Sequence, residues 1–267
     1  MSGIGGLRRI GIQIRFYAQT LAAVRDAIVN YRTEIVRLIA MMSMGTGALA
    51  VIGGTLVIVG FMTLSSGALI AVQGYNSLAG IGVEALTGFV SAFLNVRLIA
   101  PETAAVGLAA TIGASATAQI GAMRIAEEID ALEVMGIRSI AYLASSRVVA
   151  GVVVVIPLFC IAVMATFLAA RVGTTVAYGQ SVGVYDHYFR TFLNPVDLIC
   201  SFVEVVLMAI IAMLIHGYYG FTAAGGPAGV GEAVGRAVRA SLVSSVLIIL
   251  VVSLAVYGQT GNFHLSG

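Results

Sequence analysis

The sequence predicts an all-α, polytopic membrane protein whose helices cross a lipid bilayer. Hydrophobic residues make up 60% of the 267 residues and charged residues only 10%, whereas soluble domains average roughly 45–50% apolar and about 25% charged residues. The mean hydropathy is +1.04. Several apolar runs reach the length of about 20 residues that a helix needs to cross the hydrocarbon core. Segments of about ten residues with alternating polarity, which are typical of outer-membrane barrels, are missing from the sequence.

Five apolar runs are the predicted transmembrane helices. They cover residues 47–71, 104–123, 148–170, 196–217 and 241–257. Residues 81–100 are ambiguous, because their apolar part is short, contains Glu84 and is followed by Arg97 and Pro101. We interpret this segment as a re-entrant or interfacial piece, with a sixth span as the alternative. The chain is thus expected to consist of an N-terminal segment, residues 1–43, and one transmembrane domain, residues 44–267.

The arginines predict the orientation, since the chain has no lysine. With the N-terminus inside, all but three of them fall on the cytoplasmic side. The cytoplasmic set is Arg8, Arg9, Arg15, Arg25, Arg32, Arg37, Arg124, Arg138, Arg147, Arg236 and Arg239, and the others are Arg97, Arg171 and Arg190. By the positive-inside rule, the loop around residue 130 is cytoplasmic, whereas residues 171–195 and the C-terminal tail lie outside.

The N-terminal segment is predicted to be an amphipathic, interfacial helix. Its apolar residues recur at spacings of three and four, and its arginines occupy other positions, as in helices that lie on an anionic membrane surface. The apolar positions are Ile10, Ile14, Tyr17, Leu21, Val24 and Ile28. A cytoplasmic helix packed on the rest of the protein is an equally good interpretation. The segment lacks the continuous apolar core of a signal peptide.

An acidic segment, residues 127–136, lies between the second and third predicted spans. It contains four of the 12 acidic residues, Glu127, Glu128, Asp130 and Glu133. The pattern predicts a short amphipathic helix in which Ile125, Ile129, Leu132 and Met135 share a face and Gly136 forms the C-terminal cap. A cytoplasmic partner could bind this helix. From the residues alone, a solvated loop helix without a partner is the favoured alternative.

Catalytic and metal-binding patterns are missing from the sequence. Cys160 and Cys200 lie in apolar spans, where free cysteine behaves as a small hydrophobe, and His187, His216 and His264 lack metal-ligand spacing. A chain without lysine cannot supply the lysine of a phosphate-binding P-loop. We therefore expect a non-catalytic chain that has no cofactor of its own.

Small and polar residues form two periodic faces on the predicted spans. Gly53, Gly60, Gly67 and Gly74 recur every seven residues on the first span, and Gly107, Thr111, Ser115 and Gln119 recur every four on the second. Such faces allow helices to approach closely in lipid. They predict packing within the subunit or, alternatively, a subunit interface or the wall of a transport path.

Glu204 is the carboxylate predicted to lie deepest in the membrane, about two turns into the fourth span. A charge at the centre of a span costs at least about 2.5 kcal/mol on insertion scales, so the side chain should face protein or water. A direct role in transport and a structural pairing are both consistent with this position. Glu102 and Asp197 are expected nearer to the span ends.

Two blocks of sequence resemble the MlaE/YrbE permeases, which are membrane subunits of ABC-type lipid transporters that work with MCE proteins. The first block runs from Gly121 to Ile137 and continues with Tyr142-Leu143 and with Arg147 to Ala150. The second comprises His216 to Gly220 and Gly225 to Val238. The resemblance covers approximately residues 30–260. One departure is Leu98-Ile99-Ala100-Pro101-Glu102, where many members have Glu-Leu-Gly-Pro, so only the proline carries over.

The resemblance implies five spans after an interfacial helix, and a cytoplasmic ABC ATPase dimer that binds residues 124–136 as a coupling helix. The implied contacts are Arg124, Glu127, Glu128, Ile129, Asp130, Leu132, Glu133, Met135 and Gly136. ATP and magnesium would bind the ATPase, MCE-domain proteins would lie on the outer side, and membrane lipids would be the cargo. The expected location is the inner (plasma) membrane, and no nucleic-acid partner is expected.

Further details resemble the B-type YrbE subunits of actinobacterial MCE systems. They are Tyr31-Arg32 with Glu34, Leu38-Ile39-Ala40, Gly45-Thr46-Gly47 and the run from His187 to Phe192. Such a subunit pairs with a distinct A-type YrbE permease, so a heterodimer is expected. The expected function is import of a fatty-acid-like or phospholipid-like lipid. The alternatives are a structural membrane anchor for an MCE assembly and an ion-coupled secondary transporter that uses Glu204.

Overall fold

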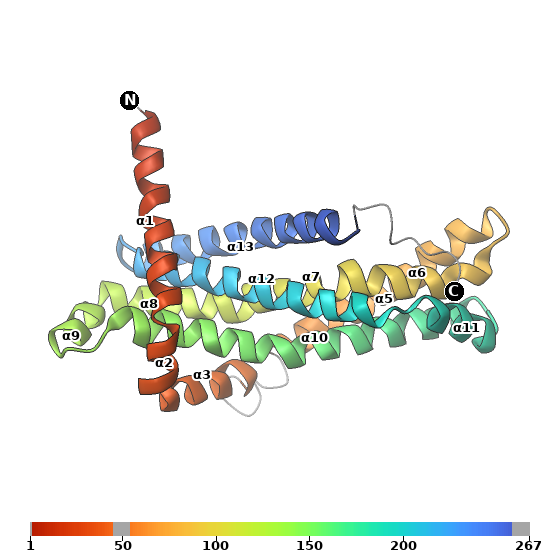
Figure 1. Cartoon of the computed structure of the whole chain (residues 1–267), viewed down its shortest axis with the longest axis horizontal. Helices are drawn as coiled ribbons and strands as arrows, with labels where there is room; N and C mark the ends of the chain where they lie inside the picture. Colours follow the sequence, from red (N-terminus) through yellow and green to blue (C-terminus); the bar gives the residue numbers. More distant parts are fainter. Residues whose placement is uncertain (1, 45–53, 258–267) are drawn as a thin grey trace. The chain divides into compact units, whose positions relative to one another are not determined.

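The computed structural model describes residues 2–44 and 54–257, and every regular element among them is helical (Figure 1). Three helices come first: α1 (Ser2–Ala22), α2 (Val24–Asn30) and α3 (Arg32–Met44). Five helical stretches of the described chain are long and apolar enough to cross a membrane: Thr55–Ala79, Glu84–Ile125, Ile140–Ala177, Pro195–Phe221 and Gly226–Ala255. The prediction of an all-α, five-span membrane protein is confirmed.

Two of the stretches contain several elements in direct succession. The second comprises η1 (Glu84–Leu86), α6 (Thr87–Leu94), η2 (Asn95–Ile99), α7 (Ala100–Gly107), η3 (Leu108–Gly113) and α8 (Ala114–Ile125). The third comprises η4 (Ile140–Ser145), α10 (Ser146–Val172) and η5 (Gly173–Ala177). The elements η2, η3, η4 and η5 are π-helical. The first, fourth and fifth stretches are α5 (Thr55–Ala79), α12 (Pro195–Phe221) and α13 (Gly226–Tyr257).

The structure corrects the interpretation of residues 81–100. Residues 84–100 form neither a separate re-entrant piece nor a sixth span, because they are continuous with the rest of the second stretch. Arg97, one of the residues that suggested a break, pairs with Asp197 within the protein. The loop predicted to lie outside contains a helix, α11 (Val182–Phe192). In the first predicted span, the described helix is Thr55–Ala79, and residues 45–53 lie outside the described chain.

The chain divides into two compact units, and its arginines divide with it. Unit 1 comprises Met1–Val51, Leu108–Val154 and Ala209–Ser244, and unit 2 comprises Ile52–Gly107, Val155–Met208 and Ser245–Gly267. All eleven arginines predicted to be cytoplasmic belong to unit 1, whereas Arg97, Arg171 and Arg190 belong to unit 2. This division agrees with the orientation that the positive-inside rule predicts.

A buried histidine joins three spans in unit 1. His216 on α12 is fully buried. Its Nδ1 lies 2.7 Å from Thr117 Oγ1 on α8, and its Nε2 lies 3.3 Å from Ser241 Oγ on α13. Gly113 leaves room for the imidazole, since a Cβ at this position would lie 2.5 Å from Cδ2 of the ring. We call this group of four residues the His216 clasp.

In unit 2, α11 packs on α6 through a close backbone contact. Gly88 on α6 lies against the carbonyl oxygen of Tyr185 and the amide nitrogen of Phe189. The Tyr185 side chain is buried, and its hydroxyl donates a hydrogen bond of 2.8 Å to Ser91 Oγ. Burial raises the pKa of Tyr185 to about 12, so this donor stays neutral. Arg171 and Asp186 form an ion pair beside this contact, with 2.8 Å between Nε and Oδ1.

Replacing Gly88 by valine is expected to detach α11 and lower the stability of the protein by about 1–3 kcal/mol, because a side chain there overlaps with backbone atoms. The measurement is the midpoint of thermal unfolding in detergent, together with proteolysis of residues 173–195. Gly183→Val is the matched control, since Gly183 is exposed and a Cβ there would lie 3.8 Å from its nearest neighbour, Ser181 Oγ. Equal midpoints for the two variants would contradict the docking of α11.

The glycine face of the first span serves packing within the chain at two described positions. A Cβ at Gly67 would lie 2.5 Å from the carbonyl oxygen of Thr166 on α10, and one at Gly74 would lie 3.6 Å from Val90 on α6. Gly60 has no atom within 4 Å of such a Cβ. Gly53 lies outside the described residues. The four glycines therefore do not share one role.

Candidate functional site

The acidic segment forms a helix that is shorter than expected. The preceding helix, α8, includes Arg124 and Ile125, and α9 spans Glu128–Val134. Between them, Glu127 has a φ of 60°, which is a left-handed conformation that a residue with a side chain rarely adopts. The predicted cap is confirmed: Gly136 has a φ of 78°, and the Ile137 amide donates a 3.0 Å hydrogen bond to the carbonyl of Leu132.

One isoleucine anchors α9. Ile129 is only 2% exposed and packs in a cluster with Ile120 of α8 and Leu143 of η4. Leu132 is partly buried against the same cluster. The prediction that Ile125 and Met135 belong to the same packed face is wrong, since both side chains are exposed. They lie beyond the ends of α9, where the chain turns and the helical periodicity no longer applies.

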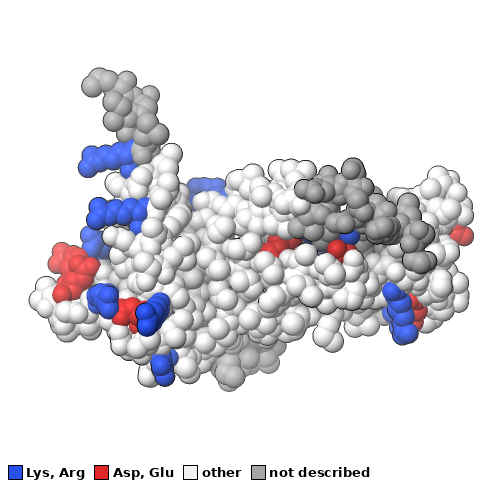
Figure 2. Space-filling view, in the orientation of Figure 1, with Lys and Arg blue, Asp and Glu red and all other residues white. Residues whose placement is uncertain are grey.

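The acidic residues of α9 and its flanks face solvent. Glu127, Glu128, Asp130 and Glu133 are all exposed, and Figure 2 shows a red patch over α9. Arg124 Nη1 lies 2.7 Å from Asp130 Oδ1, and Ser139 donates a hydrogen bond of 2.5 Å to Glu133 Oε1. Exposed ion pairs contribute roughly 0–1 kcal/mol to stability. These charges are therefore available to a partner at little cost to the fold.

The N-terminal helices hold the segment that follows α9. Ser145 of η4 donates a 2.7 Å hydrogen bond to the carbonyl of Thr20 on α1, and Arg138 pairs with Asp26 of α2 at 2.6 Å. The rings of Tyr31 and Tyr142 meet edge to face at 5.3 Å. The N-terminal helices thus hold the segment that follows α9 in place.

The predicted apolar stripe of the N-terminal segment is mostly exposed, and another face makes the protein contact. Ile10, Ile14, Leu21 and Ile28 are exposed. Phe16 is buried instead, with ring centroids 5.3 Å from Phe221 and 5.7 Å from Tyr218. The helix therefore packs on the protein, and its exposed apolar stripe is the type of surface that enters a membrane interface.

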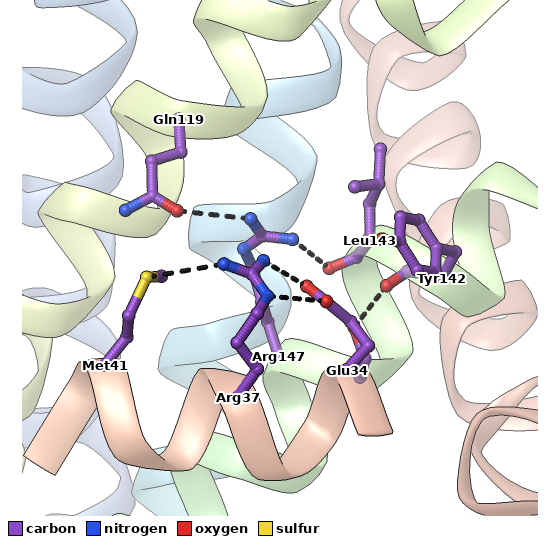
Figure 3. A network of polar contacts seen from close by, with 8 residues as sticks. Glu34, Arg37, Met41, Gln119, Tyr142, Leu143 and Arg147 are labelled. Carbon is purple, nitrogen blue, oxygen red and sulfur yellow. Dashed lines mark hydrogen bonds and ion pairs between the residues drawn. The ribbon is translucent and has the colours of Figure 1, made fainter. Parts of the chain in front are cut away.

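A buried arginine, Arg147, lies near helix α3 and was not predicted as a site residue (Figure 3). Arg147 is 4% exposed, and its guanidinium donates to the Leu143 carbonyl at 3.0 Å and to Gln119 Oε1 at 3.2 Å. Glu34 and Arg37 of α3 lie close to it and are paired with each other. The sequence signals were a single arginine directly before an apolar run and its place in the first block of the family resemblance.

The structure places the predicted polar face of the second span as follows. Gly107 is buried against Val59 of α5, Thr111 is half-buried, and Ser115 and Gln119 are exposed. Gln119 donates a 3.1 Å hydrogen bond to Ser115. The π-helical η3 lies between Gly107 and Ser115, so the four-residue spacing does not describe one straight face there. Only Ser115 and Gln119 keep a common exposed side.

Glu204 on α12 is buried in the protein, being 4% exposed. Its Oε1 atom has no hydrogen-bond partner within the described part of the chain. The expectation for Glu102 was wrong, because the helical stretch begins at Glu84 and Glu102 therefore lies well inside it. No group of three or more metal-ligating side chains was found among the described residues. Cys160 and Cys200 are both free.

The five apolar helical stretches define an all-α, polytopic membrane protein. The sequence matches the permease MlaE family over residues 44–255, and the chain belongs to this family. A probable ABC transporter permease protein of Rickettsia bellii is 30% identical over 206 residues, which cover 74% of each chain. The chain is therefore a multi-pass inner-membrane protein and an ABC transporter permease subunit.

More distant relatives come from photosynthetic organisms. The chloroplastic protein TRIGALACTOSYLDIACYLGLYCEROL 1 of Arabidopsis thaliana is 26% identical over 198 residues, which cover 73% of this chain and 56% of that protein. The probable ABC transporter permease protein slr1045 of Synechocystis is 25% identical over 196 residues, which cover 73% and 74% of the two chains.

Proposed function

We propose that this permease moves lipids, with a separate cytoplasmic ABC ATPase as its source of energy. The observation that carries the coupling role is the burial of Ile129 at the centre of α9, beneath an exposed acidic surface. A helix anchored in this way can transmit a push from a bound partner to α8 and η4, which its anchor contacts. ATP and magnesium would bind the ATPase dimer, and this chain would carry out no covalent chemistry.

The lipid cargo is supported by the plant relative, whose name is that of a glycolipid. The spans are also rich in apolar side chains, and such a surface suits a lipid better than a polar solute. The partners proposed outside the membrane are MCE-domain proteins, and the proposed direction is import. The resemblance of Tyr31-Arg32 and of His187 to Phe192 to B-type subunits supports an A-type YrbE permease as the second half of a heterodimer.

Reversing two charges on α9 tests the coupling. The double variant Glu128→Arg, Asp130→Arg is expected to weaken ATPase association at least about tenfold, which corresponds to about 1.4 kcal/mol. Lipid-stimulated ATP hydrolysis should fall with it. The measurements are co-purification with the ATPase and hydrolysis in proteoliposomes.

The control for this test is Glu232→Arg, which reverses an exposed acid on α13 that pairs with Arg236 at 3.0 Å. It should leave both measurements close to those of the unmodified protein. If the α9 double variant bound the ATPase and supported ATP hydrolysis as well as the unmodified protein, the proposed coupling role of α9 would be contradicted. Affinity purification in mild detergent with mass spectrometry of the bound proteins and lipid would identify the partners and the cargo.

A further inference from the structure

Two carboxylates lie on neighbouring spans of unit 2, the second and the fourth. Glu102 belongs to α7 and Glu204 to α12. Two polar contacts fix these spans side by side: Arg97 pairs with Asp197 at 2.7 Å, and Ser201 donates a 2.6 Å hydrogen bond to the carbonyl of Val96. Asp197, Ser201 and Glu204 follow one another at helical spacings of four and three, so they share one face of α12. Glu204 is thereby directed to the second span.

Each carboxylate has a buried oxygen without a partner. Ser245 of α13 donates a 2.8 Å hydrogen bond to Glu102 Oε1. Glu102 Oε2 and Glu204 Oε1 are buried and accept no hydrogen bond from the described residues. Both carboxylates lie on the two spans that the Arg97–Asp197 and Ser201–Val96 contacts hold together. An unsatisfied polar atom in hydrocarbon costs free energy. Binding a proton at this site would lower that cost.

Few charged residues lie on the described spans around the two carboxylates. The other charged residues of unit 2 in the second stretch and α12 are Glu84, Arg97 and Asp197, and the last two pair with each other. In unit 2, the described parts of α5 and α13 contain no charged residue, and α10 contains Arg171, which pairs with Asp186. Two neighbouring carboxylates in apolar surroundings do not both ionise.

We propose that Glu102 and Glu204 form a proton-binding pair inside the membrane, with the proton on Glu204 and a single negative charge on Glu102. The assignment within the pair follows from the contacts. The Ser245 hydroxyl stabilises the ionised form of Glu102, whereas Glu204 is more deeply buried and its Oε1 has no donor among the described residues. The role of this pair in the transport path rests on the proposed function, but the existence of the pair does not.

Labelling with a hydrophobic carbodiimide tests the pair in the assembled transporter, at pH 7 in detergent and without ATP. This reagent modifies protonated carboxyl groups. The acid proton passes to a carbodiimide nitrogen, the carboxyl oxygen adds to the central carbon, and the adduct rearranges to a stable N-acylurea. Mass spectrometry of peptides then locates and quantifies the adduct.

The expected result is one adduct per chain, on Glu204, and about tenfold less on Asp197, whose carboxylate is paired with Arg97 of the second span. Glu204→Gln should abolish the adduct, and Glu102→Gln should leave the labelled position unchanged. Absence of label on Glu204, label on both carboxyls of one chain, or equal label on Asp197 would each overturn the proposal. If a variant does not fold, the labelling of the unmodified protein decides the test by itself.

This experiment separates the pair from the proposed function. A labelled Glu204 in a complex that moves no lipid supports the pair and contradicts the proposed function. An unlabelled Glu204 in a complex that transports lipid contradicts the pair alone.

Discussion

Replacing Ile129 by aspartate is expected to abolish ATP-driven transport while the five spans remain folded. The side chain is 2% exposed in a cluster with Ile120 and Leu143, and burying an unpaired carboxylate there costs several kcal/mol. Because α9 has only seven residues and helices of that length are marginal without tertiary packing, the helix should detach. ATP hydrolysis by the assembled complex and lipid transfer in proteoliposomes are the measurements.

The matched control for Ile129 lies on the same helix. Val134 is 89% exposed, so Val134→Asp adds the same charge to α9 without disturbing its anchor. This variant should retain transport. If Ile129→Asp and Val134→Asp were equally active, the anchored-helix account of coupling would be refuted.

Replacing Gly113 by alanine is expected to destabilise the membrane domain by about 1–3 kcal/mol through overpacking. The new methyl group would lie 2.5 Å from Cδ2 and 2.6 Å from Nε2 of His216. The imidazole cannot move away without losing its contact with Thr117 or Ser241. The loss of stability is measured by thermal unfolding in detergent. The signal is the fraction of protein that remains monodisperse at each temperature.

Two variants make the Gly113 prediction specific. Gly235→Ala on α13 should be neutral, since no atom lies within 4 Å of its Cβ position. The double variant Gly113→Ala, His216→Ala should be less destabilised than the sum of the two single variants, because removing the ring makes room for the methyl group. Strict additivity would show that the methyl group and the ring do not clash.

The number of spans was predictable because hydrocarbon sets a length and a polarity that every crossing helix must meet. The ends of the helices were not, since polar residues such as Arg97 and Glu102 are tolerated once Asp197 and Ser245 bind them. These partners are about one hundred or more residues away in the sequence. The helix α11 was missed for a related reason, as its packing on Gly88 is a contact between distant segments.

The candidate site was predicted unevenly. The acidic residues, Ile129 and the Gly136 cap follow from local periodicity and backbone preference, so sequence reasoning found them. Arg147 and Glu102 were not predicted as site residues, because each depends on a neighbour from another helix. The left-handed Glu127 also has no sequence signal, since glycine or asparagine is the usual residue in that conformation.

The His216 clasp has a mechanical consequence. A helix that slid along its neighbours would have to break the contacts of the imidazole with Thr117 and Ser241. The cytoplasmic parts of three spans are therefore expected to tilt together as one lever when a motor acts on α9, and the stroke of the transporter would be a rotation of that lever.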